Sequence, residues 1–442
     1  MKWWIGSLVL LLAGMVFQLS LLVYAMYVLT GMLLISRYLS RTWINSIISS
    51  RQCSDDVVEI GETINVELTI ANRGLLTIPW ILCEDFLARE ALVRNPPSLE
   101  VKGARLTLVS LPRDGEKKLS YTLKCLRRGY FQIGPLLLET GDVFGLHRRF
   151  RIASDPFYLL VLPRVVLLRN YDLASPRPLG EIRVSHRLFE DPTLIAGVKP
   201  YEDGQPLNRI HWRATARTGA LQSKVFQPST IAGVTILLDF HAGHYQGQGG
   251  PFREELAITT AASIANALFQ MGQRFGLLTN GRDAAARIKE EGWQRTFQDR
   301  GRAQKEAMEE DRQPRLQPLT LPPSRGEAHY QTFLEILARL ELNDGFSMAE
   351  LVRTFSNFLA RNTTIVAIVS SIDLEIATSL GSLKERGFQV VAIVIAFDEP
   401  ALSDWAEAPE WVRLLLAQGI KFHRVDNDDT LAEFCSAILS NV

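Results

Sequence analysis

Three side chains capable of metal binding or acid–base catalysis lie close together after an apolar segment. Asp239, His241 and His244 follow the run at 234–238, and carboxylate and imidazole groups at the end of a strand can hold a transition metal and activate a bound water. One hypothesis is therefore a metal-dependent hydrolase that uses these three residues. The alternative, which we favour, is a polar loop above a sheet whose two histidines are hydrogen-bonded or solvated.

Signatures of other catalytic chemistry are missing from the sequence. It contains no Gly-x-Ser-x-Gly elbow and no Gly-Lys-Ser phosphate loop, and the glycines between 243 and 250 lack the lysine that a phosphate cradle needs. The four cysteines form no Cys-x-x-Cys pair, so zinc-ribbon and redox motifs are excluded and we expect reduced, buried thiols. We predict no cofactor and no catalytic residue.

A basic segment precedes the apolar run. From 205 to 238 the sequence has no acidic residue. Its candidate binding residues are Arg209, Trp212, Arg213, Arg217 and Lys224. The three arginines recur every four residues, which would place them on one face of a helix, and guanidinium groups bind carboxylates or phosphates through two parallel hydrogen bonds.

Three roles fit this segment. Its arginines could pair with acids of the adjoining domains and fix the domain junction, which we favour; they could bind a protein partner or anionic lipid; or they could bind nucleic acid. Nucleic acid is not expected, because 48 basic residues balance 48 acidic ones and the formal charge is zero. We further expect Trp212 to be packed, and 201–219 to contribute more to stability than to chemistry.

Two different patterns surround these residues. Between 55 and 163, short alternating runs are separated by Gly, Pro and Asn, which predicts an antiparallel β-sandwich. From 234 to 442, apolar strands alternate with helical stretches, which predicts a doubly wound α/β domain. The charged, proline-containing segment 282–329 would interrupt this domain as a solvated insertion. Residues 164–233 then form a linker that carries the basic segment.

The first residues predict a membrane anchor. Residues 3–36 contain no charge and no proline, a run longer than the roughly 20 residues of one crossing of the lipid bilayer. We favour a transmembrane hairpin over residues 1–40, turning near Gln18 and Ser20, rather than a secretory signal or one tilted span. Lys2 precedes the run, and the arginines that follow it are Arg37, Arg41 and Arg51. The positive-inside rule then places the soluble part in the cytoplasm, at the cell (inner) membrane.

Two further stretches carry a family resemblance. They read Arg-Arg-Gly-Tyr-Phe-Gln-Ile-Gly-Pro-Leu at 127–136 with Asp-Val-Phe-Gly-Leu at 142–146, and Tyr-Glu-Asp-Gly at 201–204 leading to Ile-His-Trp-Arg-Ala-Thr-Ala-Arg-Thr-Gly at 210–219. With them the chain resembles the bacterial domain of unknown function 58 family. The resemblance implies a membrane hairpin, a β-domain, a von Willebrand factor A-like α/β domain, and a MoxR-type AAA+ ATPase as partner. The chain departs from the family at Gln205 and Asn208, where an acid and an arginine are usual.

The fold that the resemblance implies can hold magnesium through an Asp-x-Ser-x-Ser loop, a threonine and a distant aspartate. Here the loop reads Asp-Phe-His-Ala-Gly at 239–243. Ser370 and Ser371 stand where an acid is expected, and Asp373 is displaced by two positions. We therefore expect Asp239 to be a degenerate metal position that binds no metal.

The hypothesis that uses the whole chain is a non-enzymatic, membrane-anchored adaptor or scaffold. In it the hairpin is the tether, the sandwich is the spacer and the α/β domain is the docking head for the ATPase. The competing hypothesis is the metal-dependent hydrolase of Asp239, His241 and His244, which leaves the tether and the sandwich without a role.

Overall fold

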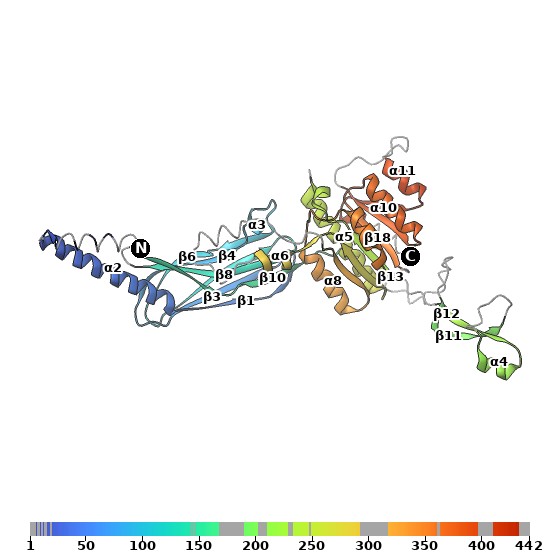
Figure 1. Ribbon diagram of the computed structural model, residues 1–442, viewed down its shortest axis with the longest axis horizontal. Coiled ribbons are helices and arrows are strands. Elements are labelled where there is room, and N and C mark those ends of the chain that lie inside the picture. The colour runs from blue at the N-terminus through green and yellow to red at the C-terminus, as the bar shows by residue number, and fades with distance from the viewer. Residues whose placement is uncertain are drawn as a thin grey trace.

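The structure is a computed structural model. It describes residues 20–142, 145, 147–167, 190–201, 210–228, 233–246, 249–291, 317–359, 363–396 and 410–432, together with scattered positions before residue 20. Along the longest axis, a helix at one end is followed by a pair of β-sheets, then by an α/β unit, and finally by a small arm at the other end (Figure 1).

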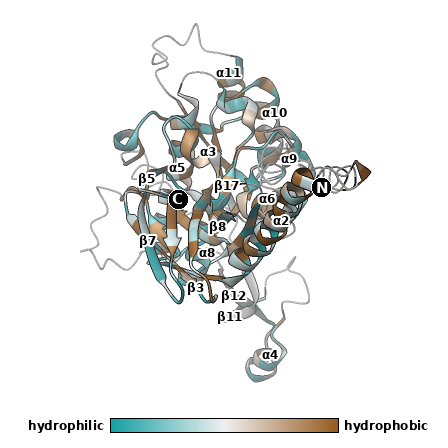
Figure 2. Ribbon diagram, turned by 90° about the vertical axis from the view of Figure 1, so that its left-hand side faces the viewer, coloured by the Kyte–Doolittle hydropathy of each residue, from teal (hydrophilic) through white to brown (hydrophobic). Residues whose placement is uncertain are grey.

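The helix at one end is α2 (Ser20–Ser46), which is long and apolar enough to cross a membrane. Figure 2 shows hydrophobic residues along it. The helix continues past the predicted limit at 40, because its last turns pack against the β-sheets. Its buried residues are Leu33, Ser36, Ser40, Trp43 and Ile44. The first helix of the predicted transmembrane hairpin lies almost wholly outside the described residues.

Two sheets pack face to face after α2 and share one hydrophobic core. The first has the order β1-β3-β7-β5, formed by Ile47–Cys53, Thr63–Asn72, Glu116–Cys125 and Leu99–Gly103. The second has the order β2-β10-β8-β4-β6, formed by Val57–Glu59, Phe157–Leu162, Gly129–Gly141, Ile78–Leu87 and Leu106–Leu111, with β9 (Arg148–Ser154) also paired to β8.

The predicted alternation is clearest in β3, where buried and exposed residues alternate along most of the strand. Two features differ from the prediction. The first strand begins at Ile47, before the expected boundary at 55, and β2 pairs with β10 in parallel, so the sandwich is not wholly antiparallel.

The α/β unit is built on a six-stranded sheet in the order β16-β14-β13-β18-β19-β20. The strands are Leu319–Ser324, Arg274–Thr279, Gly233–Leu238, Thr363–Val369, Gln389–Ile395 and Lys421–Val425. All pairs are parallel except that of β16 with β14. One face packs against α5 (Gly250–Gln270) and α8 (Glu327–Arg339). The other packs against α9 (Met348–Phe355), α10 (Leu374–Glu385) and α11 (Glu410–Ala417).

The prediction of a solvated insertion at 282–329 is wrong for the residues that the structure describes there. β15 (Arg282–Asp283) and α6 (Ala284–Glu291) follow β14 directly, β16 is the edge strand of the main sheet, and α8 begins before residue 329. The unpaired row of N–H positions on this edge strand accommodates one of the consecutive residues Pro322 and Pro323, and the register shift opposite them, between Phe275 and Leu277, accommodates the other. Residues 292–316 lie outside the described part.

The arm consists of β11 (Glu190–Pro200) and β12 (Gln222–Pro228), which form their own antiparallel two-stranded sheet, and the short helix α4 (Trp212–Thr218). The arm stands apart from the α/β unit, at the end of the molecule opposite α2 (Figure 1). Part of the predicted linker at 164–233 is therefore a folded element of its own.

Candidate functional site

Asp239 lies directly after β13, at the carboxyl end of a central strand of the parallel sheet, and it is fully buried. Its Oδ2 accepts a hydrogen bond from His244 Nδ1 at 2.5 Å, and its Oδ1 accepts one from Asn280 Nδ2 at 2.9 Å. The backbone N–H of His241 also points at Oδ1, at 3.3 Å. Both carboxylate oxygens are therefore bound by groups of the chain itself.

The two histidines of the predicted hydrolase have different local roles. The hydrogen bond to Asp239 raises the pKa of His244 above its ordinary value, although partial burial opposes the shift. His241 caps the 3-10 turn η2 (Ala242–Tyr245), because its Nδ1 accepts from the backbone N–H of Gly243 at 3.2 Å. The two rings lie 5.2 Å apart, but only the ring of His244 contacts Asp239.

The residues at the expected distant metal position are used for structure. Ser370 donates to the carbonyl oxygen of His244 at 2.7 Å, and Asp373 caps α10 by accepting from the backbone N–H of Ile376 at 2.7 Å. Among the residues that the structure describes, no group of three or more His, Cys, Asp or Glu side chains is arranged to hold a metal. What the Asp239 loop does offer is a hydrogen-bonded pair of a carboxylate and an imidazole.

Asn280 organises this loop, and sequence reasoning missed it. Besides binding Asp239, its Oδ1 accepts from the backbone N–H of Phe240 at 2.6 Å, and its Nδ2 donates to the carbonyl of Phe346 at 2.9 Å. A signal was present, since Asn280 follows the apolar strand β14 and the carboxyl ends of neighbouring parallel strands meet at one edge of a sheet.

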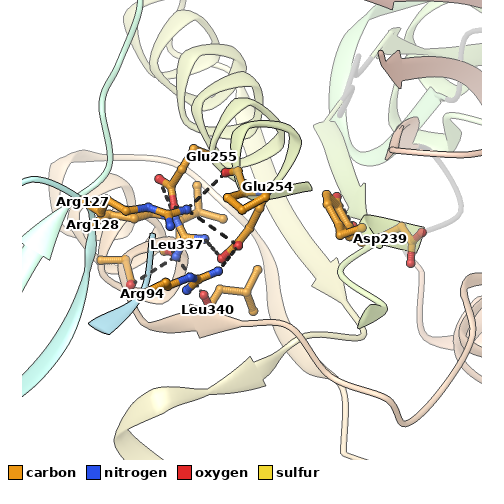
Figure 3. A network of polar contacts seen from close by, with 11 residues as sticks. Arg94, Arg127, Arg128, Asp239, Glu254, Glu255, Leu337 and Leu340 are labelled. Carbon is orange, nitrogen blue, oxygen red and sulfur yellow. Dashed lines mark hydrogen bonds and ion pairs between the residues drawn. The ribbon is translucent and has the colours of Figure 1, made fainter. Parts of the chain in front are cut away.

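The second polar site joins the sandwich to the α/β unit (Figure 3). Arg127 and Arg128 precede β8 in the sandwich, and Glu254 and Glu255 lie on α5. Arg127 is 3.1 Å from Glu255 and 3.8 Å from Glu254, while Arg128 is 3.5 Å from each glutamate. The exposed Arg94 also pairs with Glu254. We call these five residues the arginine junction.

Arg128, whose side chain is 3% exposed, makes further contacts in the α/β unit. Its Nη1 donates to the carbonyl oxygens of Leu340 at 2.8 Å and Leu337 at 3.2 Å, at the carboxyl end of α8, where a positive charge is favoured. It also lies over the ring of Phe240, 5.5 Å from the centroid. Arg128 therefore connects the sandwich with α5, with α8 and with the residue next to Asp239.

The family stretch that begins with this arginine pair continues along β8 to α2. Asp142, just after β8, accepts from the backbone N–H of His147 at 2.6 Å, and His147 Nδ1 shares a hydrogen bond of 2.7 Å with Ser36 of α2. At about 3.3 Å per residue, β8 spans about 40 Å. One strand therefore runs from the arginine junction to the neighbourhood of α2.

The predicted basic cluster is elsewhere. Trp212, Arg213 and Arg217 lie on α4, which has no buried residue, and Trp212 is 67% exposed. Lys224 is half-buried on β12, and Arg209 lies outside the described residues. The prediction of a packed Trp212 is wrong, because the described residues of the two-stranded arm form no second layer over this helix. The described residues of this cluster do not join the sandwich to the α/β unit. The arginine junction joins these two units instead.

Comparison with known proteins agrees with the family resemblance. The family described as Protein of unknown function DUF58 matches residues 197–302. An uncharacterized protein, YeaD of Bacillus subtilis (strain 168), is 23% identical over 241 residues, which span 54% of this chain and 57% of that protein. The chain thus matches little more than half the length of this curated relative.

Solved structures are similar to parts of the chain only. The CARDB domain of a Pyrococcus furiosus protein covers 26% of this chain and 91% of its own, at 15% identity and a TM-score of 0.18. Proximal thread matrix protein 1 of the mussel byssus covers 48% of this chain and 45% of its own, at 9% identity and a TM-score of 0.29.

Proposed function

We propose that this chain, a member of the DUF58 family of proteins of unknown function, is a non-enzymatic adaptor that holds an α/β docking unit at a fixed distance from a membrane. The observation that carries the proposal is the path from α2 along β8 to the arginine junction. Each end of β8 is tied by polar contacts to the next unit.

Both ends of this path are rigid by ordinary physical criteria. At one end Trp43 and Ile44 of α2 belong to the core of the sandwich, so the anchor helix cannot swing without opening that core. At the other end the side chains of Arg127, Arg128 and Glu254 are each less than 10% exposed. Units of one chain move relative to each other by default unless such an interface restrains them.

The Asp239 loop supports an adaptor better than the hydrolase alternative. A metal-dependent hydrolase needs free ligand atoms and an open coordination position. Both oxygens of Asp239 are instead taken by His244, Asn280 and a backbone N–H. No observation on the described residues favours the hydrolase.

The fold family and the partner named in the proposal come from the resemblance, and the orientation comes from the charges beside the apolar run. In the proposal the α/β unit is von Willebrand factor A-like with a degenerate metal position at Asp239, and the partner is a MoxR-type AAA+ ATPase. The soluble units face the cytoplasm at the cell (inner) membrane, with Arg37 and Arg41 exposed on α2 beyond its apolar part. Arg51 is not one of these flanking charges, because its side chain is buried against Asp85.

The test is binding of a purified MoxR-type AAA+ ATPase to the full chain in lipid nanodiscs. We expect saturable binding that does not need the Asp239 carboxylate, so Asp239→Asn binds as the native chain does. No binding of the ATPase to the native chain would refute the adaptor, as would metal-dependent hydrolysis of a generic ester or phosphodiester that Asp239→Asn abolishes.

A further inference from the structure

The arm is a self-contained structure. The backbone N–H of Tyr201 donates to the carbonyl of Leu221, and that of His211 donates to Gln222 at 2.7 Å. Gln222 N–H in turn donates to Thr215 Oγ1 at 3.0 Å, which ties α4 to β12. Ile210, bridged to β12, is 3% exposed. These contacts fix the backbone of α4 without using its outer side chains.

The outer side chains of α4 combine an aromatic ring with cations. Trp212, Arg213 and Arg217 are all exposed, and Leu221 beside them is 48% exposed. Gly219 ends the helix in the left-handed conformation, which glycine adopts without strain, so the helix is short and its position defined. Exposed tryptophan and arginine on a fixed backbone are the residue types that dominate protein–protein binding energy.

The charged side chains of the described residues close to α4 have one sign. Residues 198–201 and 210–228 contain no acidic residue. Lys199 and Lys224 lie on neighbouring rungs of the β11–β12 ladder, so their side chains point to opposite faces of the arm. The acids of β11, Glu190 and Asp191, lie at the opposite end of that strand, where Glu190 pairs with Pro228. An occupant of the α4 surface therefore meets cations and an aromatic ring.

We propose that α4, with Trp212, Arg213 and Arg217, is the docking site for an acidic surface of a protein partner. The inference deepens the adaptor proposal and rests on it, because it moves the docking site from the α/β unit to the arm. Guanidinium groups select carboxylates through paired hydrogen bonds, and the indole supplies the apolar contact that excludes water.

A protein surface fits better than the two other anionic partners. Anionic lipid is disfavoured, because the arm lies at the end of the molecule opposite the anchor helix (Figure 1). Nucleic acid is disfavoured, because the chain has no net charge and strand binding needs a wider basic footprint.

The test measures binding of a short fluorescein-labelled poly-glutamate peptide to the full chain in nanodiscs of neutral lipid. We expect Arg213→Glu/Arg217→Glu to weaken binding at least tenfold, and Trp212→Ala to weaken it measurably. The matched control is Arg73→Glu/Arg113→Glu, which makes the same charge change at exposed positions of the sandwich and should bind as the native chain does. Circular dichroism melting of each variant verifies that it is folded.

Three results would overturn the proposal. The native chain could fail to bind the peptide, or the arm and sandwich variants could lose peptide binding equally. In the third, Arg213→Glu/Arg217→Glu loses binding to phosphatidylglycerol vesicles but still binds the peptide as the native chain does. The ATPase experiment separates this inference from the adaptor. If the arm variants bind the ATPase as tightly as the native chain does, the adaptor stands and the arm assignment fails. If the native chain binds no ATPase, the adaptor fails, and the peptide result still decides whether the arm takes acidic surfaces.

Discussion

Two arginine pairs, each within a stretch that carries the family resemblance, lie in opposite environments in this molecule. Arg127 and Arg128 are buried between two units and face two glutamates, whereas Arg213 and Arg217 are exposed on a seven-residue helix. The same residue type serves structure in the first case, because burial of a guanidinium requires partners, and it is available for binding in the second. Burial, rather than spacing along the chain, separates the two roles.

The largest expected effect comes from removing Arg128. Arg128→Ala leaves Glu254 and Glu255 with fewer cations in a buried site and removes the contacts to the carbonyls of α8. We expect a loss of about 3 to 5 kcal/mol in the free energy of unfolding. Urea denaturation followed by circular dichroism measures it.

The control for Arg128 is Arg94→Ala, since Arg94 pairs with the same Glu254 but is 44% exposed. An exposed ion pair is worth about 1 kcal/mol or less. Equal and small effects of the two substitutions would remove the distinction between a buried junction and a surface pair.

The second prediction compares two tryptophans in the same way. Trp43 is 5% exposed in the sandwich core and Trp212 is 67% exposed on the arm. Trp43→Ala should cost about 3 kcal/mol through lost contacts and a cavity, near the lower end of the usual range. Within the described residues its indole Nε1 has no hydrogen-bond partner, so its removal relieves a buried unpaired donor.

Trp212→Ala should change the free energy of unfolding by no more than about 0.5 kcal/mol. Thermal melting of both variants in detergent, followed at a wavelength that reports backbone structure, gives the comparison. A destabilised Trp212→Ala would restore the packed interpretation of the basic segment.

Part of this architecture was predictable from the sequence, and the limits have physical causes. The alternation in β3 and the apolar run of β13 reflect local burial, which a short window of residues contains. The extension of α2 past residue 40 could also be predicted from the sequence. Its buried residues recur at three- and four-residue spacing, at Leu33, Ser36, Ser40 and Trp43. The two arginines Arg37 and Arg41 lie on the other face of the helix.

The site residues were harder to predict, because their partners come from distant parts of the chain. Arg128 binds Glu254 and the carbonyls of Leu337 and Leu340, and no local pattern couples these positions. The exposure of Trp212 depends on the arm having no covering layer among its described residues, which is a property of the topology. Asp239 was recognised, but its pairing with Asn280 depends on the adjacency of β13 and β14.

The third prediction uses pH, to which neither arginine pair responds near neutrality. The pKa of His244 is raised in the folded chain, so protonated His244 stabilises the fold below its ordinary pKa of 6.5, and this stabilisation is lost as the pH rises through the raised pKa. The free energy of unfolding should therefore fall by about 1 kcal/mol relative to His244→Gln as the pH rises from about 6 to about 8.

The comparison with His244→Gln is necessary, because burial lowers the pKa of His423 and gives a trend of the opposite sign. His423 is unchanged in the variant, so the difference between the two pH curves isolates His244. Parallel curves would show that the Asp239–His244 contact does not bind a proton more tightly in the folded chain.

The smallest effect is expected for the double substitution Arg213→Glu/Arg217→Glu. Because α4 has no buried residue, the free energy of unfolding should stay within about 0.5 kcal/mol of the native value. Differential scanning calorimetry of the full chain tests this. A loss of several kcal/mol would mean that the arm arginines are structural, and the contrast between the two pairs would disappear.

The most direct test of the central claim, that the arginine junction fixes the α/β unit on the anchored sandwich, is a distance measurement between the two units. Spin labels carried by an unnatural amino acid at positions 113 and 353, both 61% exposed, report the separation of the sandwich and α9 by double electron–electron resonance. We predict one narrow distance distribution for the full chain in nanodiscs, and a broad one for Arg127→Ala/Arg128→Ala. A broad distribution in the native chain, or no change in the variant, would contradict the account.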